Sequence, residues 1–171
     1  MDSPTGSINS VAYGKRGITN DEPRDPRGDR AVRAPRPLRV LLSRIGDTRV
    51  ELPTPMAHVF RQAGMEVVVA GAGLTPEIVC AAAIQEDVDV VCVSALDAEN
   101  SEALKRIPLL LHRVGATEKL LLAGSGVFDT DRAVLEAAGI QRVFPIGADL
   151  GEIVRYVEDW RDNRLQVRLD G

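Results

Sequence analysis

The chain has 171 residues, 44% of them hydrophobic, which is enough for one domain with its own core. Its net charge of −4 offers no broad positive field, and this argues against nucleic acid as a partner. No apolar run approaches the ~20 residues that cross a bilayer, and the N-terminus lacks the apolar core of a secretory signal. We therefore expect a cytoplasmic protein that contacts no membrane.

Residues 1–37 differ in composition from the rest of the chain. They are rich in Gly, Pro, Ser, Asp and Arg, and their apolar residues, such as Val11 and Tyr13, are isolated. A segment of this kind cannot bury enough apolar surface to offset the entropy that it loses on ordering. We predict a flexible N-terminal arm at 1–37, an α/β domain at 38–163 and a short C-terminal tail at 164–171.

From Leu38 onward, short apolar segments rich in Val and Leu alternate with segments of helical period. Five such βα units follow one another, which is typical of a parallel sheet covered by helices on both faces. The expected strands are Leu38–Ser43, Glu66–Ala70, Val88–Ser94, Lys119–Ala123 and Arg142–Pro145. The predicted fold class is therefore α/β with a five-stranded parallel sheet.

The first two helices have clear boundaries. The first buries Met56 and Phe60 on one face and ends at Gly64, a suitable C-terminal cap. The second begins at Thr75, whose hydroxyl can accept a hydrogen bond from the first turn. Pro76 follows at a position where a missing N–H group costs nothing.

The boundaries of the later helices are less sharply marked. Pro108 either kinks the third helix or marks its true start. Beyond the last helix, the alternation of Leu165, Val167 and Leu169 with polar residues indicates an edge strand or a docking tail. The third, fourth and fifth helices are expected within Ser101–Val114, Asp129–Ala138 and Asp149–Asn163.

Two families with the same winding of strands and helices do not match the sequence. In open parallel sheets, ligands bind beyond the carboxyl ends of the strands. A dinucleotide-binding fold needs G-x-G-x-x-G directly after the first strand, and this chain has Ile45-Gly46-Asp47-Thr48-Arg49 there. A phosphoacceptor receiver domain needs an acid at the end of the third strand and a lysine at the end of the fifth. This chain has Ser94 and Pro145 at those positions.

Five stretches of the sequence form a distinctive set: Arg39–Leu42, Arg61–Val67, Leu74–Val79, Gln85–Val91 and Val143–Phe144. Together they resemble the cobalamin-binding domain of acyl-CoA and glutamate mutases, especially the small-subunit type of the methylmalonyl-CoA and isobutyryl-CoA mutases. The resemblance implies a flavodoxin-like (Rossmann-like) strand order of 2-1-3-4-5, with cobalamin as the cofactor. It also implies a role as the small subunit of a carbon-skeleton isomerase, paired with a large subunit that binds acyl-CoA.

The signature of that family has three parts: D-x-H-x-x-G after the first strand, S-x-L after the third and a Gly-Gly turn after the fourth. Ser94-Ala95-Leu96 matches the second part, and Gly124-Ser125-Gly126 matches the third in part. In relatives these two elements line the slot for the nucleotide tail of the cofactor. The resemblance thus implies cofactor-binding roles for Asp47, Ser94, Leu96, Gly124, Ser125 and Gly126.

The first part of the signature is degenerate in this chain. Asp47 is in place, but Arg49 stands where the family has its cobalt-ligating histidine, and Leu52 replaces the glycine. A guanidinium has no lone pair to give to a metal. His58 and His112 fall on the polar faces of their helices, without converging partners. We expect no metal ligand from the protein, and any cobalamin to bind without a histidine on cobalt.

Three functions fit the sequence, and the resemblance favours the first. The chain is either the cobalamin subunit of an acyl-CoA mutase, working with a large subunit or as a homo-oligomer, or a cofactor-independent enzyme on the same fold. In the enzyme, Asp47 and Arg49 would be the candidate catalytic residues. The third function is an interaction module that binds a partner with its arm. Because the three functions differ in this respect, the sequence leaves open whether the chain is an enzyme. For the enzyme, we expect these polar residues to converge: Arg44, Asp47, Arg49, Glu51, Ser94, Asp97, Glu99 and Ser125.

Overall fold

The structure, a computed structural model, describes residues 36–46, 54–95, 97–125, 129–145 and 147–170. These residues belong to one compact unit that begins at Arg36. The predicted arm before Arg36 lies outside the described residues, so its role stays a prediction.

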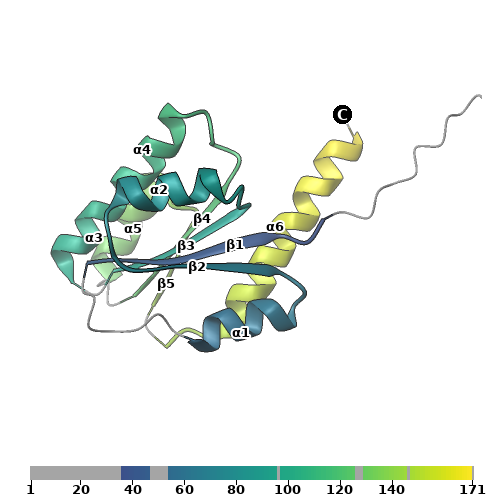
Figure 1. The fold of residues 1–171 in the computed structure, drawn as a ribbon, viewed down its shortest axis with the longest axis horizontal. Helices are drawn as coiled ribbons and strands as arrows, with labels where there is room; N and C mark the ends of the chain where they lie inside the picture. The colour runs from purple at the N-terminus through teal and green to yellow at the C-terminus, as the bar shows by residue number, and fades with distance from the viewer. Residues whose placement is uncertain (1–35, 47–53, 96, 126–128, 146, 171) are drawn as a thin grey trace, which may run out of the picture. The chain divides into compact units, whose positions relative to one another are not determined.

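Five parallel strands form one sheet in the order β2-β1-β3-β4-β5 (Figure 1). The parallel pairing and the strand order confirm the fold predicted from the sequence and its resemblance. The strands are β1 (Arg39–Ile45), β2 (Glu66–Leu74), β3 (Val90–Ala95), β4 (Leu120–Ser125) and β5 (Arg142–Pro145).

The first four strands run past the carboxyl ends predicted for them. Polar and glycine residues interrupt the apolar pattern there, which makes the ends hard to predict. Pairing with neighbouring strands nevertheless continues, since Arg44 pairs with Ser94 and Ser94 pairs with Gly124. The ordered sheet therefore reaches further toward the edge at which such folds bind their ligands.

Helices cover both faces of the sheet, as predicted (Figure 1). On one face, α1 and α6 pack Phe60 and Val157 into a core with Val40 and Leu122. On the other face, α2 to α5 form a second core around Leu41. The helices are α1 (Thr54–Gln62), α2 (Pro76–Gln85), α3 (Ala98–Leu104), α4 (Arg106–Arg113), α5 (Asp129–Ala137) and α6 (Leu150–Asp170).

The predicted helix boundaries around β2 are confirmed. The Thr75 hydroxyl accepts a hydrogen bond from the Ile78 N–H group over 3.4 Å, and Pro76 occupies the first helical position of α2. Gly64 follows α1 with a φ of +78°, a conformation that glycine adopts without strain. These local signals could be found in the sequence because they depend on neighbouring residues only.

The helix predicted within Ser101–Val114 is in fact two helices. Of these, α3 ends at Leu104 and α4 begins at Arg106. Pro108 lies in the first turn of α4, where a backbone nitrogen has no intrahelical partner to lose. Of the two roles considered for Pro108, a place at the start of a helix is the one that the structure supports.

The edge strand considered for the C-terminus is wrong, because α6 continues to Asp170. The alternative, a docking tail at 164–171, stays a prediction. The residues after Asn163 are mostly good helix formers, and an alternation over five residues is too short to override them. Tertiary contacts also hold this part of α6, since Arg164 donates a hydrogen bond to the Glu118 carbonyl over 2.7 Å. None of the described helices is long and apolar enough to cross a membrane.

Candidate functional site at the carboxyl ends of the strands

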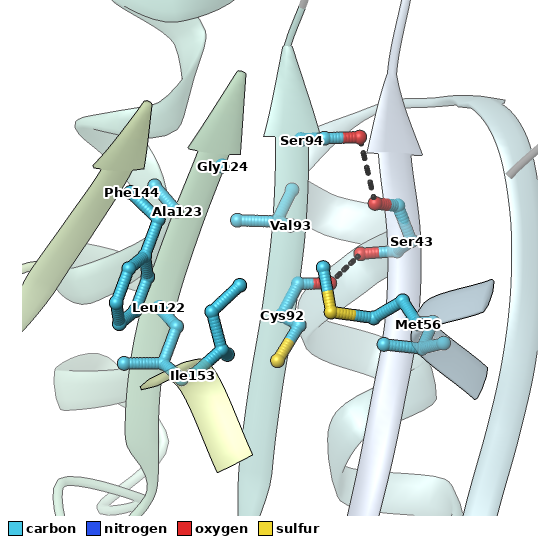
Figure 2. Close-up of a pocket in the computed structure, with 11 residues that line it drawn as sticks. Ser43, Met56, Cys92, Val93, Ser94, Leu122, Ala123, Gly124, Phe144 and Ile153 are labelled. Carbon is cyan, nitrogen blue, oxygen red and sulfur yellow. Dashed lines mark hydrogen bonds between the residues drawn. The ribbon is translucent and has the colours of Figure 1, made fainter. Parts of the chain in front are cut away.

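A pocket opens between the sheet and helices α1 and α6, toward the carboxyl ends of β1, β3 and β4 (Figure 2). Its volume is about 50 Å³. The lining is almost entirely apolar, with Ser43 and Ser94 as its polar members. The lining residues are Leu42, Ser43, Met56, Cys92, Val93, Ser94, Leu122, Ala123, Gly124, Phe144 and Ile153.

The alternation of side chains along the strands places the floor of this pocket. Leu42, Cys92 and Leu122 occupy equivalent positions on three neighbouring strands and face α1 and α6. Met56 from α1 and Ile153 from α6 close the pocket over them (Figure 2). A thioether side chain is flexible, so the Met56 wall can rearrange around a ligand more easily than the floor.

A chain of hydrogen bonds orders the polar side of the pocket. Arg44 is 4% exposed, and its Nε atom donates to the Ser94 hydroxyl over 3.2 Å. Ser94 in turn donates to the Ser43 carbonyl over 3.5 Å, and the Ser43 hydroxyl donates to the Cys92 carbonyl over 3.3 Å (Figure 2). The position of the Ser94 hydroxyl is therefore set by β1 as well as by β3.

Asp97 and Asn100 form the start of α3, close to the carboxyl end of β3. One carboxylate oxygen of Asp97 accepts a hydrogen bond from the Asn100 backbone N–H over 2.8 Å. The other accepts one from the Asn100 side-chain nitrogen over 2.6 Å. Asp97 thus caps α3 and also fixes the Asn100 carboxamide.

Asn100 is the residue of this region that the sequence analysis missed. Its carboxamide lies against Gly46, directly after β1, so closely that a Cβ atom on Gly46 would overlap it. The capping pattern of Asp97 three residues before Asn100 is visible in the sequence. The contact with Gly46 is not, because it joins the end of β1 to the first turn of α3, far apart in the sequence.

The described residues offer little nucleophilic or metal-binding chemistry. Burial raises the pKa of the Cys92 thiol to about 12, so Cys92 stays protonated at neutral pH and is a poor nucleophile. His58 and His112 are exposed on α1 and α4, as predicted from their helix faces. Among the described residues, no three His, Cys, Asp or Glu side chains converge as a metal site would require.

Two of the predicted cofactor-binding residues, Ser94 and Gly124, line the same pocket. Ser125 is the last residue of β4 and pairs with Pro145. The remaining predicted site residues lie outside the described residues: Asp47, Arg49, Leu96 and Gly126.

Only part of the polar cluster expected for a cofactor-independent enzyme lies within the described residues. Arg44 and Ser94 come together, but their contact orders the strand ends. Both carboxylate oxygens of Asp97 accept hydrogen bonds from Asn100, and Glu99 is exposed on α3. Glu51, like Asp47 and Arg49, lies outside the described residues.

Comparison with known proteins gives two informative relatives. The chain is 38% identical over 111 residues to the 2-hydroxyisobutanoyl-CoA mutase small subunit of Aquincola tertiaricarbonis. This aligned region covers 63% of this chain and 79% of that protein. It is 36% identical over 136 residues to the pivalyl-CoA mutase small subunit of Xanthobacter autotrophicus. Here the aligned region covers 79% of this chain and 91% of that protein. No family model matches the sequence.

Among solved structures, the chain is similar to a cobalamin-binding protein from Desulfitobacterium hafniense. The TM-score is 0.58 and the sequence identity 15%, over 72% of this chain and 59% of that one. At this identity the likeness concerns the fold alone, and it agrees with the strand order described above.

Proposed function

We propose that this chain, which belongs to the small subunits of acyl-CoA mutases, binds cobalamin. It holds the nucleotide tail of the cofactor in the pocket beneath Met56 and Ile153. When bound, cobalamin supplies the cobalt–carbon bond on which carbon-skeleton rearrangements depend. The residues of this chain bind and orient the cofactor. A separate large subunit binds the acyl-CoA substrate and is the partner of this chain.

The observation that carries the proposal is the meeting of Ser94 and Gly124 on one pocket. Each belongs to a different part of the family signature, and the two are far apart in the sequence. The pairing of β3 with β4 sets them opposite each other at the carboxyl edge. A ligand that enters between the sheet and α1 therefore meets both.

The chemistry of the pocket fits the aromatic base of a nucleotide tail. The base is flat and largely apolar, and the lining is apolar apart from Ser43 and Ser94. The pocket of about 50 Å³ is smaller than the base. Binding therefore requires the Met56 side chain to move aside, which its flexibility allows.

Cobalt in this protein receives no protein nitrogen, according to the proposal. Arg49 stands at the position of the ligating histidine and cannot donate a lone pair. His58 and His112 are exposed on α1 and α4, and neither lines the pocket. Because the pocket holds the base of the tail away from cobalt, the visible spectrum of the bound cofactor is expected to be that of a corrinoid with no nitrogen base on cobalt, and to differ from that of free cobalamin.

Incubation with hydroxocobalamin, followed by desalting and a visible spectrum, tests the proposal. The Gly124→Leu variant places an isobutyl group in the pocket, because a Cβ atom there meets nothing within 4 Å. The matched control is Ala133→Leu, which adds a similar group at an exposed position on α5.

We expect the wild type and Ala133→Leu to retain colour and Gly124→Leu to lose it, with all three folded by circular dichroism. A wild type that keeps no cobalamin would contradict the proposal. Equal retention by Gly124→Leu would place the tail elsewhere. A spectrum with histidine on cobalt would contradict the proposed mode of ligation.

A further inference from the structure

Asn100 covers Gly46 at the point where the chain leaves β1. Gly46 has a φ of +74°, and a Cβ atom built on it would lie 2.6 Å from the Asn100 side-chain oxygen and overlap the adjoining carbon and nitrogen. Real Cβ atoms essentially never approach another heavy atom so closely. Gly46 is therefore required both by its backbone conformation and by the side chain above it.

The Asn100 side chain cannot easily turn away from Gly46, because Asp97 holds it. Its nitrogen donates to Asp97 Oδ2 over 2.6 Å, while its backbone N–H donates to Asp97 Oδ1 over 2.8 Å. Asp97 is itself held, since its carbonyl accepts a hydrogen bond from the Ser101 hydroxyl over 2.8 Å.

This contact extends the junction between β1 and β3. Backbone pairing of the two strands ends with Arg44 and Ser94, and the Nε atom of Arg44 donates to the Ser94 hydroxyl there. Gly46 and Asn100 meet just beyond that pair. The contact between Gly46 and Asn100 thus continues the junction where the backbone pairing of β1 and β3 ends, two residues beyond Arg44 in β1.

We propose that Asn100 is a positioning residue for the nucleotide-tail pocket. By covering Gly46, it fixes the end of β1 against the first turn of α3 and so keeps Arg44 aligned with Ser94, which lines the pocket. The inference rests on the proposed function, because the placement of Ser94 affects binding only if the pocket takes the tail. Asn100 itself need not touch the cofactor.

Two corrinoids separate positioning from general stability. Cobalamin carries the nucleotide tail, and cobinamide is the same macrocycle without it. We expect Asn100→Ala to weaken cobalamin binding about tenfold, which is the order of effect of one lost hydrogen bond. Its affinity for cobinamide should equal that of the wild type. The matched control on α3 is Glu102→Ala, an exposed change that should affect neither affinity.

The outcomes distinguish this inference from the proposed function. A wild type that binds no cobalamin overturns both. A wild type that binds cobalamin, with an unchanged affinity in Asn100→Ala, overturns the positioning role and leaves the proposed function intact. An equal loss for cobalamin and cobinamide also overturns it, because the effect is then not on the tail.

A second measurement tests the contact without any cofactor. Gly46→Ala should lower the melting temperature, because the added methyl group collides with Asn100 and the positive φ is unfavourable for alanine. Adding Asn100→Ala removes the collision, so the double variant should melt above Gly46→Ala alone. The loss of melting temperature in the double variant could instead equal the sum of the losses in Gly46→Ala and Asn100→Ala. In that case Asn100 does not cover Gly46 and the inference is wrong.

Discussion

Arg44 and Ser94 are partners across β1 and β3, and the buried Arg44 Nε atom donates a hydrogen bond of 3.2 Å to the Ser94 hydroxyl. The serine of the S-x-L motif therefore has a structural role in addition to lining the pocket. Its hydroxyl accepts a hydrogen bond from the Arg44 guanidinium, a charged group that has little access to solvent. Changes at Ser94 should accordingly affect stability even without a ligand.

Ser94→Ala should lower the free energy of unfolding by about 1–3 kcal/mol, because a buried donor loses an acceptor. Ser94→Thr keeps a hydroxyl and is the control, with a loss clearly smaller than that of alanine. Urea denaturation of the three proteins gives the comparison. An alanine variant as stable as the wild type would show that the hydrogen bond contributes nothing.

Thr75→Ala should destabilise the domain by about 1 kcal/mol, because the Ile78 N–H group loses its capping acceptor. Thr75→Ser retains the hydroxyl and should lie close to the wild type in melting temperature. Identical behaviour of the alanine and serine variants would mean that the cap does not stabilise α2.

The last part of α6 should depend on Arg164. Its guanidinium lies 4.8 Å from the centre of the Trp160 ring and donates to the Glu118 carbonyl. We expect Arg164→Ala to cost about 1–2 kcal/mol in thermal or urea unfolding, and Arg164→Lys to cost less. No loss in Arg164→Ala would indicate that this end of the helix is held by other contacts.

Removal of residues 1–35 and of residues 1–37 should differ slightly in effect. Arg36 makes a two-pronged hydrogen bond to Asp89, with distances of 3.0 and 3.1 Å. The pair is partly exposed, so its loss should cost up to about 1 kcal/mol. Arg36→Ala in the full chain should reproduce that cost.

We expect removal of 1–35 alone to leave the melting temperature nearly unchanged. A large drop would show that the arm stabilises the domain.

Stability should fall in mild alkali because of Cys80. Burial, with a smaller contribution from the Glu77 carboxylate, raises the pKa of Cys80 from 9.0 to about 11. The unfolded chain therefore loses this proton at lower pH than the folded chain does. The stabilisation is complete below pH 9 and is lost as the pH rises toward 11.

Between these limits the wild type should lose up to about 1.4 kcal/mol per pH unit more than Cys80→Ala, the value for one proton. Urea unfolding at several pH values measures the two slopes. Parallel slopes for the two proteins would show that the Cys80 thiol titrates alike in the folded and unfolded chains.

Much of the fold could be predicted because its signals are local. The apolar strands, the cap at Thr75 and the end of the first helix at Gly64 each depend on residues close together in the chain. The C-terminal alternation misled the prediction. Whether 164–170 continues the helix is decided partly by contacts of Arg164 with residues distant in the sequence.

The sequence by itself determined the fold class and the family resemblance, because motif residues keep their spacing along the chain. It also predicted Ser94 and Gly124 as cofactor-binding residues, and both line the pocket. Only the tertiary structure decided that Met56, Phe144 and Ile153 close the pocket around them, and that Asn100 lies over Gly46. These residues come from separate helices, strands and turns. Their meeting depends on how the strands pair and how the helices pack, and neither leaves a pattern in the neighbouring residues.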